Sequence, residues 1–118
     1  MISLSEVAEK LELQVVASNG TLTRPVAAGY ASDLLSCAMS RAKKDYIWVT
    51  LQAHVNVVAV ASLLGLSGVI ITEGNLPDPD TIARAESEGV VLLLTPKPTF
   101  AVVSELAALG VRDEPEQG

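Results

Sequence analysis

Three uninterrupted apolar runs constrain the fold of this chain more than any other feature. They occupy residues 46–49 (YIWV), 68–71 (GVII) and 90–94 (VVLLL). Strands that helices cover on both faces have continuous runs of this kind, whereas strands with one wet face alternate apolar and polar residues. The runs therefore predict a mainly parallel β-sheet that is buried between two layers of helices.

Helical segments with recognisable ends separate these runs. Ser3 and Glu6 form a capping box at the start of one helix. Asp78 and Pro79 suit the N-cap and first position of another, and Gly89 suits its end. The predicted helices cover residues 4–11, 34–42, 55–64, 79–88 and 99–109, and two further predicted strands cover residues 13–17 and 26–31.

The segment between the two amino-terminal strands contains residues that favour a turn. Asn19-Gly20 suits a tight turn that needs positive φ, and residues 21–24 read as a short return strand that Pro25 interrupts. Short alternating strands and helices predict right-handed βαβ units. We therefore expect a compact three-layer α/β sandwich with an amino-terminal helix and a short β-turn segment. A single domain would cover residues 1–110, and residues 111–118 would form a flexible acidic tail.

Composition excludes several classes of protein. The chain has 118 residues, 49% of them hydrophobic, and a net charge of −6 with 8 Lys and Arg. Binding to nucleic acid usually requires a basic surface, so this negative net charge makes a nucleic-acid partner improbable. A lone Cys37 and a lone His54 predict neither a disulfide nor a metal cage, which fits a reducing cytoplasm. Residues 55–71 are too short and too interrupted for a membrane span, and the amino terminus lacks the pattern of a signal peptide.

Polar residues gather where the predicted strands end. In open α/β sheets ligands bind outside the carboxyl ends of the strands. If the sheet is parallel, the polar strand ends share one edge and form a candidate ligand site. The candidate ligand-binding residues are Ser32, Asp33, Thr50, Gln52, His54, Asn56 and Thr72.

Each of these residues also has a structural interpretation. Ser32 and Asp33 would form a catalytic pair or would cap the helix that follows. His54 would act as a base, a phosphate contact or a neighbour of a helix cap, and Asn56 would cap that helix. The chain contains no GxxxxGK[ST], GxGxxG, GxSxG or HExxH motif. We therefore predict no catalytic residue, no cofactor and no enzyme, and phosphoryl transfer through His54 or Asp33 is the weakest alternative.

Three stretches resemble the small stand-alone DRTGG-domain proteins. They are GYASDLLS at residues 29–36, WVTLQAHVNVVAVA at 48–61 and IITEGNLPD at 70–78. The resemblance extends from residue 4 to residue 110, although the chain lacks a DRTGG string. It implies an α/β module of unknown function that is related in fold to the N-terminal domain of HPr kinase/phosphorylase. Such modules occur within phosphotransacetylases and beside CBS domains in regulated pyrophosphatases.

The resemblance also implies a regulatory or dimer-forming role, and it transfers no catalytic residue. Stand-alone members accompany iron-only hydrogenase and NADH-dehydrogenase-like components, so the resemblance implies a partner in a redox enzyme system. We therefore expect a non-catalytic regulatory or accessory domain that forms a homodimer through an exposed apolar patch. The alternative is a sensor that binds a nucleotide or a phosphorylated metabolite at the strand ends.

Overall fold

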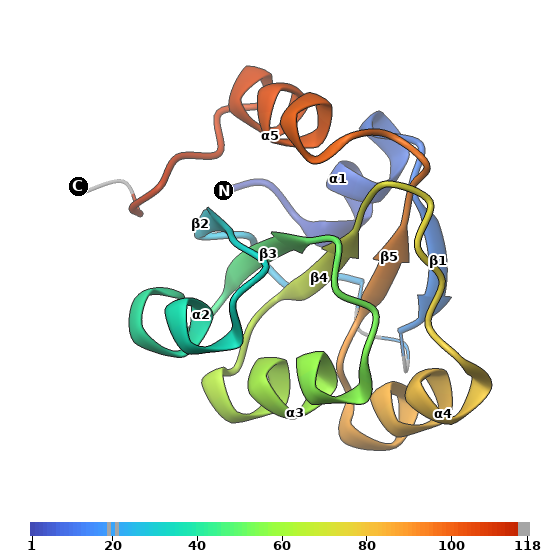
Figure 1. Ribbon diagram of the computed structural model, residues 1–118. Helices are drawn as coiled ribbons and strands as arrows, with labels where there is room; N and C mark the ends of the chain where they lie inside the picture. Colours follow the sequence, from blue (N-terminus) through green and yellow to red (C-terminus); the bar gives the residue numbers. More distant parts are fainter. Residues whose placement is uncertain (19, 21, 116–118) are drawn as a thin grey trace.

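A computed structural model describes residues 1–18, 20 and 22–115 of the chain, and these residues form five helices and one five-stranded sheet (Figure 1). The elements follow one another as α1 (Leu4–Lys10), β1 (Gln14–Ala17), β2 (Ala28–Ala31), α2 (Leu35–Arg41), β3 (Tyr46–Thr50), α3 (Val55–Leu64), β4 (Gly68–Ile71), α4 (Pro79–Glu88), β5 (Leu92–Leu94) and α5 (Thr99–Ala108).

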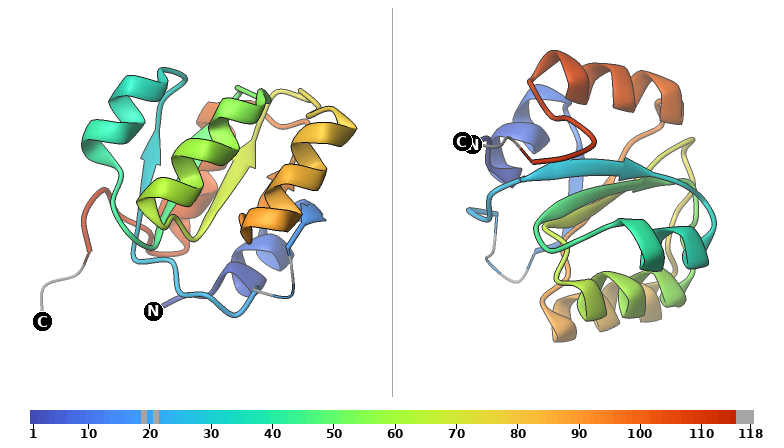
Figure 2. Two further views of the ribbon diagram at one scale, coloured as in Figure 1. Left: turned by 90° about the horizontal axis from the view of Figure 1, so that it is seen from below. Right: turned by 90° about the vertical axis from the view of Figure 1, so that its left-hand side faces the viewer.

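The sheet has the strand order β1-β5-β4-β3-β2. Strands β2, β3, β4 and β5 are parallel, whereas β1 pairs antiparallel with β5 at one edge. Helices α2, α3 and α4 cover one face, and α1 and α5 cover the other (Figure 2). The predicted three-layer sandwich with a mainly parallel sheet is therefore confirmed.

The core on the face of α2, α3 and α4 is centred on Trp48, which is completely buried. Its ring packs in one cluster with residues of β4, α3 and α4. The indole Nε1 donates to the carbonyl oxygen of Ser32 at 2.9 Å, so the polar atom of this side chain also has a partner. Burial of the ring with its N–H satisfied ties the end of β2 to β3.

The opposite face is covered less evenly. Ile47, Val49, Ile70 and Leu93 point toward α1 and α5 and form the second core cluster with residues of both helices. In the described part of the chain, two helices cover this face of the five-stranded sheet, whereas three cover the other. The strand β2 consequently lies at the margin of the α5 layer, at the sheet edge farthest from β1 (Figures 1 and 2).

Helix ends agree with several of the sequence signals. The Ser3–Glu6 capping box is present, and Gly89 ends α4 in the left-handed conformation with φ 71°. The Asp78 carboxylate accepts from the Thr81 amide at 2.8 Å. This backbone hydrogen bond, followed by one from the Thr81 side chain, lowers the pKa of Asp78 below its ordinary value.

Two predicted caps are wrong. Helix α2 begins at Leu35, and its N-cap, Leu34, makes no side-chain cap bond. The Ser32 hydroxyl accepts from the Leu34 amide ahead of the helix, and Asp33 bonds to a different loop. In α3 the N-cap is His54, whose Nδ1 accepts from the Asn56 amide at 3.2 Å. An imidazole nitrogen thus takes the role that we expected of an amide side chain.

The predicted return strand is also wrong over its described part. Residues 22–24 form no strand, and Asn19 and Thr21 lie outside the described residues. The carbonyl oxygens of Leu22 and Arg24 accept from the first amides of α1, so this segment closes the start of a helix. The Arg24 guanidinium bonds to Asp45 and to the Gly65 carbonyl, both at 2.8 Å.

Within the described ranges, no helix has both the length and the apolar character that are needed to cross a membrane. The same residues contain no group of three or more His, Cys, Asp or Glu side chains arranged to hold a metal ion.

Candidate functional site

The carboxyl ends of the parallel strands meet at one edge of the sheet. Thr50, the last residue of β3, lies opposite Ile71 of β4, and Ala31, the last residue of β2, lies opposite Val49. The loops that follow these strands therefore lie next to one another. We call this region the polar edge, and it contains the seven residues that the sequence suggested as ligand contacts.

Asp33 is the centre of the hydrogen bonding at the polar edge. Its Oδ1 accepts from Thr50 Oγ1 at 3.0 Å and from the Leu51 amide at 2.8 Å. The Gln52 side chain donates to the Asp33 carbonyl at 3.2 Å, and the Gln52 amide donates to Thr50 Oγ1 at 3.1 Å. These bonds fasten the loop after β2 to the loop after β3, which is a structural role.

Thr72 is completely buried and is bonded on both sides. Its Oγ1 lies 2.6 Å from Thr99 Oγ1 and donates to the Thr50 carbonyl at 3.4 Å. Because Thr72 is completely buried, its hydroxyl is inaccessible to a ligand and serves to join the end of β4 to β3 and to the start of α5. The structure thus brings Thr72 to the expected edge but uses it inside the fold.

Sequence reasoning missed two residues that complete this hydrogen bonding. Asn75 Nδ2 donates to the Leu51 carbonyl at 2.6 Å, and Glu73 Oε2 accepts from the Thr99 amide at 2.8 Å. Both lie in the turn after β4, whose Glu73 and Gly74 have φ 63° and 74°. The clustering of Glu, Gly and Asn in a turn was the available signal, since these residues tolerate positive φ or supply side-chain hydrogen bonds.

His54 and Asn56 are the most accessible of the seven candidates, together with Asp33. Nδ1 of His54 is occupied by the Asn56 amide. No hydrogen bond joins the Asn56 side chain to another residue in the described part of the chain. The polar atoms that this edge offers to an outside molecule are therefore few, and they lie at the start of α3.

The charge at the polar edge is negative. Asp33, Glu73, Asp78 and Asp80 lie in the loops and the helix start at this edge. The nearby Lys97 is already engaged, since its Nζ donates to Glu105 and to the Leu11 carbonyl, each at 2.9 Å. A phosphate group would approach a surplus of carboxylates here, which opposes its binding.

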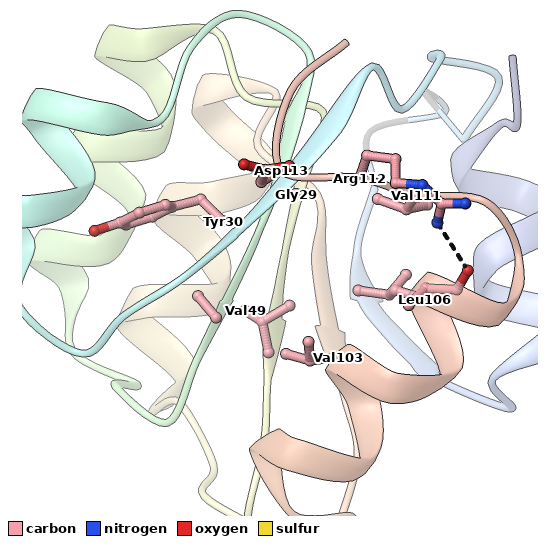
Figure 3. A pocket seen from close by; sticks show the side chains of 10 residues that line it. Gly29, Tyr30, Val49, Val103, Leu106, Val111, Arg112 and Asp113 are labelled. Carbon is pink, nitrogen blue, oxygen red and sulfur yellow. Dashed lines mark hydrogen bonds between the residues drawn. The ribbon is translucent and has the colours of Figure 1, made fainter. Parts of the chain in front are cut away.

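A second candidate lies on the flank of the sheet beside β2. An apolar groove of about 380 Å³ runs between β2, α5 and the segment that follows α5. Figure 3 shows Val49, Val103 and Leu106 turned toward the space between the strands and α5, while Tyr30 points away from it. The groove is lined by Gly29, Tyr30, Ala31, Val49, Val103, Leu106, Ala107, Val111, Arg112 and Asp113.

Small residues in β2 create this groove. Its strand sequence is AGYA, and Gly29 offers no side chain to the space under α5. A Cβ at Gly29 would lie 3.3 Å from the Val111 side chain, so the absent side chain lets the segment after α5 approach closely. The Ala and Gly content of residues 28–31 was the signal in the sequence that could have located the groove.

Helix α5 extends the apolar surface beyond the groove. Phe100, Val103 and Ala107 follow one another at helical spacing, so they share one face of α5. Phe100 is 85% exposed and Val103 is 40% exposed. The sequence predicted an exposed apolar patch without locating it, and this surface is the strongest candidate. We call Phe100, Val103, Ala107 and the groove the β2 flank.

Comparison with known proteins identifies the fold. No protein-family model matches the chain, and no curated protein matches it. A solved structure that covers 96% of this chain has a TM-score of 0.68 and 17% sequence identity. It is the crystal structure of the CBS and DRTGG domains of the regulatory region of Clostridium perfringens pyrophosphatase, complexed with the activator diadenosine tetraphosphate. The match covers 47% of that chain, so the present chain spans about half its length. The chain therefore has a DRTGG-domain-like fold, as the resemblance implied.

Proposed function

We propose that this chain is a non-catalytic regulatory or accessory domain that acts as a homodimer and associates through the β2 flank. The single observation that carries the proposal is the apolar groove, which continues into the exposed face of α5. Contiguous exposed apolar surface is one of the features that mark interaction sites between proteins. A twofold symmetric pair is its commonest use.

The contrast with the polar edge supports a non-catalytic role. A catalytic site displays titratable groups toward a space that a substrate can enter. Here Asp33, Thr50 and Thr72 are bonded to neighbouring loops. The fold similarity is consistent with this interpretation, because the solved structure is a regulatory region.

Sedimentation equilibrium of the full chain over a wide range of concentrations tests the proposal. The expected result is an average mass that rises from one copy of 12.3 kDa toward two copies. The double variant Phe100→Ser, Val103→Ser should shift this rise to higher concentrations without unfolding the chain. A single copy at millimolar concentration, in a folded sample, would refute the dimer.

A small-molecule sensor is the second candidate function. Two observations favour it: the solved structure contains a nucleotide activator, and the polar edge presents the accessible His54 and Asn56 at the start of α3. The carboxylates at this edge would favour contact with a sugar or base over contact with phosphate.

Thermal melts against adenine nucleotides, acetyl phosphate and NADH test the sensor function. A ligand at about 100 times its dissociation constant adds about 2.7 kcal/mol and should raise the midpoint by several degrees. The rise should disappear in His54→Ala and Asn56→Ala. A response that both variants retain would remove the polar edge as the site.

The partner of the domain is a separate proposal. The resemblance points to a hydrogenase or an NADH-dehydrogenase-like enzyme. Co-purification of such an enzyme with the tagged full chain, and its loss with the Phe100→Ser, Val103→Ser variant, would support an accessory role through the β2 flank. Equal recovery with both proteins would assign the contact to another surface.

A further inference from the structure

Phe100 is the single phenylalanine of the chain, and it is 85% exposed at the start of α5. The helix packs on the sheet without it, because Val102 and Leu106 are 0% and 4% exposed and belong to the second core cluster. Neither core cluster of the described residues includes Phe100. Folding of a single copy therefore gains little from the largest apolar side chain of α5.

An open hollow lies on the same face of α5. Seven residues make almost two helical turns, so Phe100 and Ala107 point in directions that differ by about 20° and lie about 10 Å apart along the axis. Ala107 lines the groove of about 380 Å³, whereas Phe100 does not. A cavity of about 150 Å³ holds a benzene molecule, so the groove has room for a phenylalanine ring. Each copy thus has a projecting ring and a hollow that its own ring does not fill.

We propose that Phe100 of each copy inserts into the groove of a second copy, through an antiparallel pair of α5 helices. This inference rests on the proposed homodimer and specifies which residues meet. Residues that a twofold axis exchanges lie at equal distances from it, and the midpoint between positions 100 and 107 falls beside Val103. The large ring of one copy then stands opposite the small Ala107 of the other, and the two Val103 side chains meet at the axis.

The features of this face favour a second copy as the occupant. A twofold interface uses one patch that is complementary to itself, and here a large and a small side chain occupy positions that the axis exchanges. The antiparallel arrangement also brings the positive amino end of each helix dipole near the negative carboxyl end of the other.

The charges on this face do not oppose the pairing. The only charged residue of α5, Glu105, is paired with Lys97 at 2.9 Å. The groove adds one cation and one anion, Arg112 and Asp113. Charge is therefore balanced on this face, although each chain has a net charge of −6.

The area of the contact sets the strength that we expect. A buried phenylalanine covers about 150–250 Å². Two rings, the walls of two grooves and two Val103 side chains would together bury about 800 Å², which is roughly half of a standard interface. The pair should therefore be weak and reversible, and its population should depend on protein concentration.

Disulfide cross-linking tests the arrangement. A Phe100→Cys copy and an Ala107→Cys copy, both in a Cys37→Ser background, are mixed at high concentration and oxidised gently. The mixture should form a disulfide-linked dimer, because the two introduced thiols face each other, whereas neither copy should do so alone. The mixed pair keeps one unmodified contact, between Phe100 of the second copy and Ala107 of the first. Val103→Cys should cross-link with itself.

Ala108→Cys is the matched control for Ala107→Cys. It is also exposed, but it points about 100° away around the helix. Mixed with the Phe100→Cys copy, it should give little cross-linked product. The thermal midpoints of the reduced variants should match that of the Cys37→Ser chain, because the substituted positions are exposed.

Ala107→Leu provides a second measurement that needs no thiol. The larger side chain would occupy the site of the ring, so association in sedimentation equilibrium should weaken at least about tenfold, whereas Ala108→Leu should leave it unchanged. A dimer that Ala107→Leu leaves intact, or equal cross-linking at positions 107 and 108, would overturn the insertion of Phe100 and retain the proposed dimer. A folded monomer at millimolar concentration would overturn both.

Discussion

The polar edge and the β2 flank differ in how far their side chains are bonded within the chain. At the polar edge, Asp33, Thr50 and Thr72 have partners within the chain. On the β2 flank, Phe100 and Val103 have large exposed surfaces and the groove beside them is apolar. A cluster of polar residues in a sequence suggests a binding site. In this fold, however, the side chains that remain available for contact with another molecule are mainly apolar.

This contrast predicts that the two regions respond to different measurements. Substitutions at the polar edge should change the free energy of unfolding, because they break bonds between loops. Substitutions on the β2 flank should change association, because Phe100 is 85% exposed and Val103 is 40% exposed in the single copy.

The largest effect is expected for Asp33→Ala. The substitution leaves the buried Thr50 hydroxyl and the Leu51 amide without an acceptor, so the free energy of unfolding should fall by about 2 kcal/mol. Asp33→Asn keeps one acceptor oxygen and should lose less. Urea unfolding curves provide the measurement. Unchanged stability in Asp33→Ala would contradict the structural role that we assign to this carboxylate.

Phe100→Ser should have the next largest effect. A phenylalanine that is 85% exposed contributes little to folding, so stability should change by less than about 0.5 kcal/mol. Its burial between copies is worth roughly 1.4 kcal/mol, and the dissociation constant should rise about tenfold.

Leu63→Ser is the matched control for Phe100→Ser. Leu63 is 70% exposed on α3, which packs on the opposite face of the sheet. It should leave both stability and association unchanged. If the two variants weakened the dimer equally, general surface hydrophobicity would explain association, and the β2 flank would lose its special role.

A smaller effect is expected for His54→Ala. The variant loses the Nδ1 acceptor at the start of α3, so stability should fall by about 0.5 kcal/mol. Asn56→Ala removes a side chain with no such bond and should change stability less. Thermal melts of both variants provide the comparison. A larger loss of stability in Asn56→Ala would show that His54 is not the residue that caps α3.

The smallest effect concerns Asp78 and pH. Hydrogen bonds from Thr81 lower the folded-state pKa of Asp78 below its ordinary value. A lowered pKa contributes stability above the unfolded-state value, and this contribution disappears as pH falls through the folded-state pKa. The difference in melting temperature between the unmodified chain and Asp78→Asn should therefore shrink toward the acid end. A difference that stays constant with pH would contradict the assignment.

The periodicity of apolar residues and the signals at helix ends were sufficient to predict most of the fold from the sequence. The apolar runs around Trp48, Ile70 and Leu93 identified β3, β4 and β5, because buried parallel strands contain few polar residues. Capping signals located the starts of α1 and α4. The antiparallel pairing of β1 with β5 was not predicted, because strand order depends on long-range packing.

The candidate site was predicted only in part. The sequence placed the polar residues at one edge, but it could not show that Asp33 binds the next loop and that His54 caps a helix. Such bonds depend on the distance between loops that are far apart in sequence. The groove depends on Gly29 together with Val103 and Val111, which come together only in the folded chain.

The central claim is that the β2 flank, and not the polar edge, is the working surface of this domain. Backbone amide NMR spectra across a dilution series test it most directly. We predict concentration-dependent shifts in β2 and along α5, with His54 and Asn56 unaffected. Shifts confined to the polar edge, or none at millimolar concentration, would contradict the claim.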